Sequence, residues 1–170
     1  NKGIFDYPVQ NLIIGLKLAT GTLQPGTITE VVRDTEGQAL FGIGSIGAEQ
    51  VKAFRKANKT QSLFVMAIAD DEDAVKASGT ITFTGAVSQA LVLRFKIAGQ
   101  QVRFTAQSTA TVAQLAASLA AAINENTSLP VTAAAAAGVV TVTSRHGGEV
   151  GNDIDLRVDI EAQPLPTGLN

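Results

Sequence analysis

Three glycines in the first half of the chain have the spacing of a dinucleotide-binding turn. Gly42, Gly44 and Gly47 form a G-x-G-x-x-G pattern that begins within the short apolar run 39–43 and opens an expected helix. In a dinucleotide-binding fold, such a turn follows a buried strand and places the pyrophosphate on the helix N-terminus, and an acidic residue binds the ribose. Asp70, after the next expected strand, is the acidic residue in the corresponding place.

The surroundings of these glycines favour a packing turn instead. The apolar run before them is short for a buried first strand, and Asp70 lies later than the usual offset of about 20 residues. The pattern after Asp70 also indicates antiparallel strands, whereas a dinucleotide-binding fold adds parallel ones. Glycine permits a tight turn and close packing without any ligand. We therefore expect no cofactor, and the alternative is a nucleotide-binding protein that uses Gly42, Gly44 and Gly47.

No well-formed catalytic set is visible. The chain has no cysteine, and His146 is its single histidine, with Ser144 and Asp153 nearby in sequence. A Ser–His–Asp triad is defined by geometry, and the segment 145–148 has the composition of a loop tip. We expect no catalytic residue and no enzymatic activity.

Two acidic clusters resemble places where a hard cation could bind. Residues 70–73 read Asp-Asp-Glu-Asp, but the spacing and the glycine of a calcium-binding EF-hand loop are absent. Asp153, Asp155 and Asp159 are expected on one face of a strand, with Arg157 among them. We expect a solvated acidic loop, an exposed or partner-facing strand surface, and no metal site.

A basic stripe is expected on the helix that follows the glycines. Lys52, Arg55, Lys56 and Lys59 lie at i, i+3, i+4 and i+7, so they share one side of a helix. Cations in the last turns of a helix are also favoured by its dipole, which explains them without a partner. The functional alternative is a subunit contact with an acidic surface. Nucleic acid is not expected, because the net charge is −2 and no aromatic residues interleave with these charges.

The fold class that these patterns predict is α+β, with a mixed α/β layer over residues 1–75. Ser45 is a plausible N-cap for the helix that carries the basic stripe. The continuous apolar run 63–69 predicts a strand buried on both faces and paired in parallel with an earlier one. The other elements expected here are a strand at 9–18, a loop at 20–27, a short strand at 28–33, a short apolar piece at 39–43 and the helix at 46–58.

An antiparallel hairpin and helix module is expected over residues 76–161. Thr111 and Gln114 have the spacing of a capping box at the start of a helix that ends near Asn126. Turns are expected at Gly99 and at Gly138. The expected strands are 80–85, 90–99, 100–106, 130–136, 139–145 and 153–160, the last with strict alternation. Residues 162–170 are expected to be a linker to a C-terminal region that is missing.

No apolar run approaches the roughly 20 residues that span a bilayer, and no secretory signal is visible, so no membrane partner is expected. The chain does not start with methionine. We expect it to be cut from a longer protein.

Several stretches, in order along nearly the whole chain, resemble the tail sheath proteins of Mu-like contractile phages. They are NLIIGLKLATGT (11–22), QALFGIGS (38–45), VKAFRKANKT (51–60), LFVMAIADD (63–71), ASGTITFTGA (77–86), IAGQQV (97–102), LPVTAAAAAGVVTVTSRHGGEVGNDIDLRV (129–158) and LPTGL (165–169). No single stretch is an active-site signature, and in this family the glycine turn is a structural element.

The resemblance implies a structural subunit of the phage tail, located in the virion and in the host cytoplasm during assembly. Its implied partners are other sheath subunits, the tail tube protein and the baseplate, with no small-molecule substrate. Such subunits polymerise around the tail tube and contract to drive it through the host envelope. Family members are far longer than 170 residues, so the chain is expected to be an N-terminal, peripheral fragment. A generic virion surface or adhesion module is a further alternative, given the Thr-rich antiparallel strands.

Overall fold

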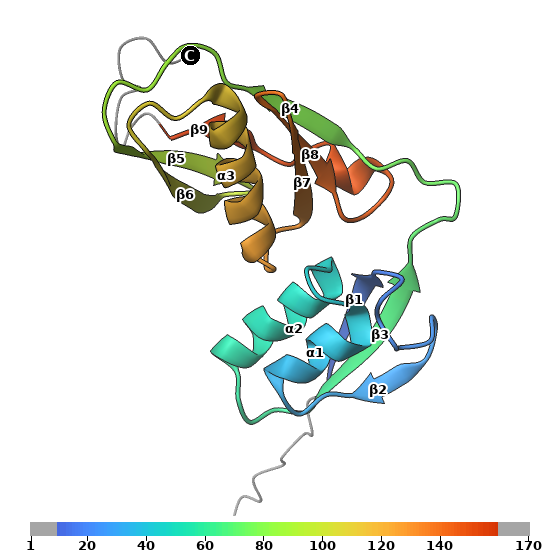
Figure 1. The fold of residues 1–170 in the computed structure, drawn as a ribbon. Coiled ribbons are helices and arrows are strands. Elements are labelled where there is room, and N and C mark those ends of the chain that lie inside the picture. The colour runs from blue at the N-terminus through green and yellow to red at the C-terminus, as the bar shows by residue number, and fades with distance from the viewer. Residues whose placement is uncertain (1–9, 160–170) are drawn as a thin grey trace, which may run out of the picture. The chain divides into compact units, whose positions relative to one another are not determined.

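The computed structural model describes residues 10–159. The chain forms two compact units, and the boundary between them in the sequence falls between Asp70 and Asp71 (Figure 1). Within the described range there are three α-helices and nine strands, which form open sheets. This mixed composition confirms the predicted α+β class.

The first unit is built on a three-stranded sheet in the order β1-β3-β2. β1 (Asn11–Lys17) runs parallel to β3 (Leu63–Ala69), as predicted, and β2 (Ile28–Glu30) pairs with β3 in the antiparallel direction. Figure 1 shows α1 (Asp34–Phe41) and α2 (Ile46–Ala57) on one face of this sheet. The core therefore lies between the sheet and the two helices.

Only one face of β3 is buried within this unit. Leu63, Val65 and Ala67 pack into the core, whereas Phe64 and Met66 are half-buried and Ile68 is exposed. The prediction of a strand buried on both faces is therefore wrong for the described residues. Its apolar side chains alternate between a covered and an uncovered face.

Helix α1 was not predicted, and the apolar run 39–43 is largely its last turn. The carboxylate of Glu36 accepts hydrogen bonds from the backbone N–H groups of Val32 (2.8 Å) and Arg33 (3.3 Å), which holds the start of the helix. Gly42 ends it with φ +91° and donates its N–H to the carbonyl of Gln38. A short apolar run does not distinguish a strand from a buried helix turn, which is why the sequence pattern failed here.

The second unit contains two three-stranded antiparallel sheets and one long helix. One sheet has the order β4-β8-β7 and the other β6-β5-β9. The strands are β4 (Ser78–Thr82), β5 (Leu91–Ile97), β6 (Gln100–Ala106), β7 (Val131–Ala136), β8 (Val139–Ser144) and β9 (Leu156–Val158). A 3₁₀ turn, η1 (Glu149–Gly151), precedes β9.

Both predicted hairpins of this unit are present. β5 pairs with β6 and β7 with β8 in the antiparallel direction. Each two-residue turn is an Ala-Gly pair with positive φ at both positions, namely Ala98 (+50°) with Gly99 (+74°) and Ala137 (+47°) with Gly138 (+89°). Positive φ at both central residues suits the twist of a tight hairpin.

Helix α3 (Val112–Glu125) begins with the predicted capping box. The Gln114 N–H donates to the Thr111 hydroxyl oxygen (3.2 Å), and the Thr111 N–H donates to Gln114 Oε1 (2.9 Å). The helix buries Leu115, Leu119 and Ile123 in a core that also holds three phenylalanines in mutual ring contact, Phe83, Phe95 and Phe104.

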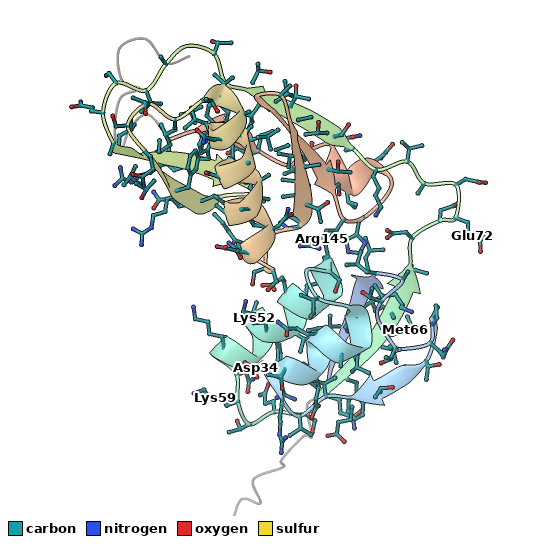
Figure 2. All side chains as sticks on the ribbon, in the orientation of Figure 1. Asp34, Lys52, Lys59, Met66, Glu72 and Arg145 are labelled. Atoms are coloured by element: carbon teal, nitrogen blue, oxygen red, sulfur yellow. The ribbon has the colours of Figure 1, made fainter. Side chains whose placement is uncertain are left out.

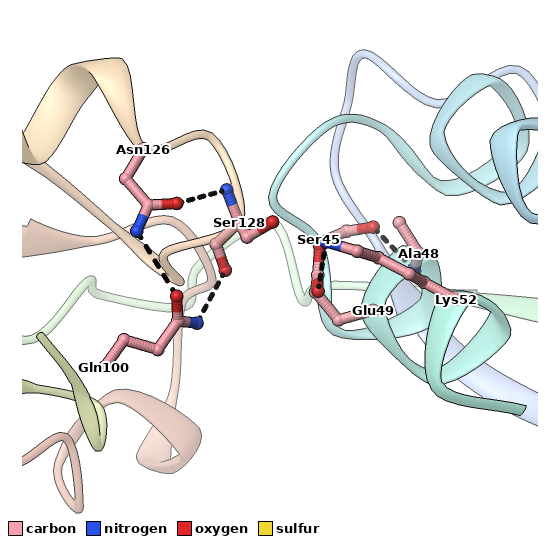
Figure 3. Close-up of polar contacts among 7 residues, drawn as sticks. All are labelled: Ser45, Ala48, Glu49, Lys52, Gln100, Asn126 and Ser128. Atoms are coloured by element: carbon pink, nitrogen blue, oxygen red, sulfur yellow. Dashed lines mark hydrogen bonds and ion pairs between the residues drawn. The ribbon is translucent and has the colours of Figure 1, made fainter. Parts of the chain in front are cut away.

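The C-terminal end of α3 is tied to two strands by polar contacts. Asn124 contacts the sheet-edge strand β7, donating from Nδ2 to the Ala133 carbonyl (2.8 Å) and accepting the Ala133 N–H at Oδ1 (2.9 Å). Asn126 donates to Gln100 Oε1 and accepts from the Ser128 N–H, and Gln100 donates to the Ser128 carbonyl (Figure 3).

The last strand is shorter than predicted, and one of its acids faces inward. β9 covers only part of the predicted 153–160. Asp159, predicted to face out, is buried, where its carboxylate lies 3.5 Å from the Lys96 ammonium and accepts a hydrogen bond from Gln101 (3.0 Å). Residue 160, the end of the predicted strand, and the predicted linker at 162–170 lie outside the described residues.

Candidate functional site

The glycine turn joins two helices. α1 ends at Phe41 and α2 begins at Ile46, so Gly42 and Gly44 lie between helices, and Gly47 lies in the first turn of α2. A dinucleotide-binding fingerprint needs a strand before its first glycine, because that strand directs the turn toward the ligand. The observed turn therefore has the spacing of the fingerprint without its structural context.

The turn is filled by the chain's own atoms. Ser45 is fully buried, its hydroxyl accepts the N–H of Ala48 (3.1 Å) and donates to the carbonyl of Gly42 (2.7 Å), and it is the predicted N-cap of α2 (Figure 3). The ring of Phe41 packs directly on Gly47, where an added Cβ would lie 2.2 Å from Phe41 Cδ1. This contact explains the glycine at 47 by packing alone.

The residues considered for a catalytic triad do not form one. The Ser144 hydroxyl donates to the backbone carbonyl of His146 (2.8 Å), not to its imidazole. His146 lies in the predicted loop, residues 145–148 between β8 and η1, but its side chain is turned inward and only 1% exposed, whereas Asp153 is exposed. The serine and histidine therefore contribute to the interior of the second unit.

In each acidic cluster, one carboxylate has a local partner: a backbone N–H in the first cluster and an arginine in the second. Asp71 accepts the N–H of Asp73 (2.9 Å), which closes a local turn in an exposed segment, and Asp155 pairs with Arg157 (3.0 Å). Glu72 in the same exposed segment is labelled in Figure 2. Across residues 10–159, no group of three or more His, Asp or Glu side chains is placed to hold a metal ion.

The basic stripe is not one exposed surface, because Arg55 is buried. Its guanidinium donates from Nη1 to the carbonyl of Gln61 (2.8 Å) and from Nη2 to the carbonyl of Val31, and it lies 5.7 Å from the centre of the Phe54 ring. Arg55 is therefore not part of the subunit contact predicted for the basic stripe. It instead connects α2 to the segments that contain Val31 and Gln61. A long side chain at the edge of a helical stripe can reach inward, and spacing alone does not reveal this.

Three lysines remain exposed, and we call them the lysine surface: Lys52, Lys56 and Lys59. Lys52 pairs with Glu49 one turn earlier (3.3 Å), and Lys59 lies beyond the end of α2 (Figures 2 and 3). An exposed ion pair of this kind contributes little to stability. The lysine surface thus combines the Lys52–Glu49 pair with two further exposed cations, Lys56 and Lys59.

Arg145 of the second unit is another cation with a structural role. Its Nε donates to the carbonyl of Leu129 (2.9 Å), and partial burial lowers the pKa of its guanidinium below its usual range. Arginine remains charged across the physiological range despite such a shift. The Arg145 side chain therefore fixes the segment that leads into β7, and it is not a candidate proton donor.

A cavity of about 220 Å³ lies in the second unit beside β4 and β8. Its lining includes Val131, Val142, Ile154 and Leu156, and its buried hydroxyl, Ser144, already donates to a backbone carbonyl. This lining carries no set of groups that would orient a substrate.

The feature that sequence reasoning missed is an uncovered apolar sheet face in the first unit. Leu12 and Ile14 of β1, Ile28 of β2 and Ile68 of β3 are among its large exposed hydrophobic side chains. The alternation of Leu12, Ile14 and Leu16 with residues of the helix-covered face was the signal that could have revealed it. Among the described residues, no helix is long and apolar enough to cross a membrane.

Comparison with known proteins gives one relationship over nearly the whole chain. No protein-family model matches. The chain is 35% identical over 159 residues to the Mu-like prophage FluMu tail sheath protein of Haemophilus influenzae, an alignment that covers 93% of this chain and 33% of that protein. The chain thus spans about a third of the length of this relative. The resemblance predicted from the ordered stretches is confirmed.

Proposed function

We propose that this chain is part of a structural subunit of a contractile phage tail sheath. The observation that carries the proposal is its 35% identity to a tail sheath protein, which extends over 93% of the chain. The site geometry supports a structural role, because the glycine turn, Ser144 and His146 are all used in packing. No catalytic residue is proposed.

The full-length subunit would polymerise with its copies around the tail tube and contract on a signal from the baseplate. Contraction would drive the tube through the host envelope, with the energy stored in subunit packing, as in other bistable assemblies. The partners are then other sheath subunits, the tube protein and the baseplate. The proposed locations are the virion tail and, during assembly, the host cytoplasm.

The two units have different proposed parts in the subunit. Residues 1–75 would be one portion of an α/β sheath domain, residues 76–161 an antiparallel module inserted in it, and 162–170 the connection onward. The chain corresponds to a third of its relative. We propose that it is a peripheral portion that does not polymerise alone. Light scattering that showed rings or tubes formed by the 170-residue chain would contradict this.

Electron microscopy of the full-length protein tests the main proposal. We expect long hollow tubes of sheath subunits at near-physiological salt. A protein that stays monomeric across salt and pH, or whose melting temperature rises on titration with NAD or ATP, would count against it, because a ligand that binds the folded state stabilises it.

A further inference from the structure

The uncovered face of the first-unit sheet is largely apolar, and the exposed Glu30 of β2, opposite Phe64, is the charged residue of the three strands that lies on it. Side chains at alternate positions of β1 and β3 share this face, with Leu12 opposite Phe64, Ile14 opposite Met66 and Leu16 opposite Ile68. Ile28 of β2 extends it, opposite Met66. We call these seven side chains the open face; Figure 2 labels Met66 on β3.

The open face differs sharply from the face that α1 and α2 cover. Ile14 is 49% exposed, Ile28 58% and Ile68 48%, whereas Val65 and Ala67, which lie between them on the other side of the sheet, are essentially inaccessible. Contiguous apolar surfaces larger than a few hundred Å² are rare on soluble monomers and mark interaction surfaces. Four of the seven side chains of the open face are exposed and the other three are half-buried, so the face presents neighbouring apolar groups to solvent.

The strand pairing indicates what kind of layer belongs there. All-parallel sheets occur almost only with helices covering both faces, and such covered sheets often carry an antiparallel edge strand. The sheet of the first unit has this form, with β1 parallel to β3 and β2 as the antiparallel edge strand. α1 and α2 supply one such layer. The missing layer on the open face would be the apolar stripe of one or more amphipathic helices.

We infer that the open face is the docking surface for a helical layer of the same polypeptide, from the two thirds of the subunit that lie outside this chain. This inference rests on the proposal that the chain is part of a longer sheath subunit, since its relative is about three times as long. An internal layer is favoured over a second copy because a subunit must stay soluble before it polymerises, and a bare face of this kind would aggregate.

Thiol labelling of the full-length subunit tests this directly, because the chain has no cysteine of its own. Ile14→Cys places a thiol on the open face, and Val150→Cys is the matched control, since Ile14 is 49% and Val150 46% exposed here. Any cysteines elsewhere in the subunit are replaced first. In unassembled subunits we expect a maleimide to react at least tenfold more slowly with the thiol at 14 than with the thiol at 150.

Equal rates at the two positions in unassembled subunits would overturn the inference. Equal rates before assembly with slow labelling only in tubes would assign the face to a second copy, which also overturns it. Ile68→Cys provides an independent position on the same face if Ile14→Cys does not fold. Tube formation is scored separately by microscopy, so a protected thiol in a subunit that never assembles would refute the sheath function and leave this inference standing.

Discussion

Arg55 and Lys56 are neighbours in sequence and were expected to share a role, but their side chains differ in environment. Arg55 is buried and donates to two backbone carbonyls, whereas Lys56 is exposed on α2. Both are cations at the end of the same helix, so composition and spacing cannot separate them. What separates them is whether an acceptor lies within reach, and that depends on where Val31 and Gln61 are placed by the fold.

Arg55→Ala should destabilise the first unit by about 1–3 kcal/mol, because it removes the donor to the buried carbonyl of Val31 and the part-buried hydrogen bond to the carbonyl of Gln61. Lys56→Ala is the matched control and should change the unfolding free energy by no more than about 0.5 kcal/mol, as is usual at exposed positions. Urea denaturation of the chain measures both. Equal effects would mean that the Arg55 contacts do not contribute to stability.

Gly47→Ala tests whether the glycine turn is a packing device. Alanine gains at most about 1 kcal/mol of helix propensity over glycine, but its Cβ would overlap the buried Phe41 ring, and overpacking typically costs about 1–3 kcal/mol. We therefore expect a lower melting temperature. Gly79→Ala, whose new Cβ would meet only the end of Leu156 at 3.3 Å, should have a smaller effect. A stabilising Gly47→Ala would show that the turn has free space.

Glu36 should make the stability of the chain depend on acid pH. Hydrogen bonds from the Val32 and Arg33 N–H groups lower the pKa of its carboxyl below the usual 4.5. Its stabilisation is therefore fully present above about pH 4.5 and is lost as the pH falls through the lowered value. Glu36→Gln should be less stable than the wild type at pH 7, with the difference shrinking below pH 4.5. A difference that stays constant with pH in urea titrations would contradict this assignment.

At the scale of elements, most local signals were read correctly, whereas of the strand pairings distant in sequence only the parallel pair of β1 and β3 was predicted. The Ser45 cap, the Thr111–Gln114 box and both Ala-Gly hairpins depend on neighbouring residues, so the sequence contains them. The pairing of β4 with β8 and of β5 with β9 joins segments far apart in the chain, and no local pattern specifies such a partner. α1 was missed because its stabilising contacts lie at its start, while its apolar residues resemble a strand.

Thr111→Ala should destabilise the second unit by about 0.5–2 kcal/mol, the usual cost of removing an N-cap hydroxyl. Thr111→Ser keeps the hydroxyl that accepts the Gln114 N–H and should restore most of the stability. Thermal unfolding followed by circular dichroism reports the helix directly. If serine and alanine behave alike, the capping contact is not what stabilises α3.

For the whole molecule, the sequence predicted the α+β class and the resemblance to sheath proteins, while the prediction of a doubly covered β3 was wrong for this chain alone. That error is informative, because the apolar run 63–69 has the composition of a strand covered on both faces. Under the inference above, the second covering layer is formed by residues outside this chain, so this structure does not contain it. The predicted subunit contact also differs from the structure, because Arg55 is buried and only the other three members of the basic stripe remain on the surface.

Reversing the lysine surface should impair assembly of the full-length subunit. With Lys52→Glu and Lys56→Glu together, we expect fewer tubes by turbidity and microscopy at low salt, and a smaller difference at high salt, because screening weakens charge contacts. Lys76→Glu with Arg103→Glu, two exposed cations of the second unit, makes the same change in net charge as a control. Unchanged assembly at every salt concentration would remove the lysine surface from the subunit contacts.

The contact between Asn124 and Ala133 has a consequence for how the protein behaves when crowded. β7 is an edge strand of small alanine side chains, which would normally let a foreign strand approach and extend the sheet. The Asn124 amide occupies both the donor and the acceptor of Ala133, as a neighbouring strand would. One side chain thereby protects the middle of this edge against amyloid-like growth, which would matter most if the proposed sheath subunit packs against many copies of itself.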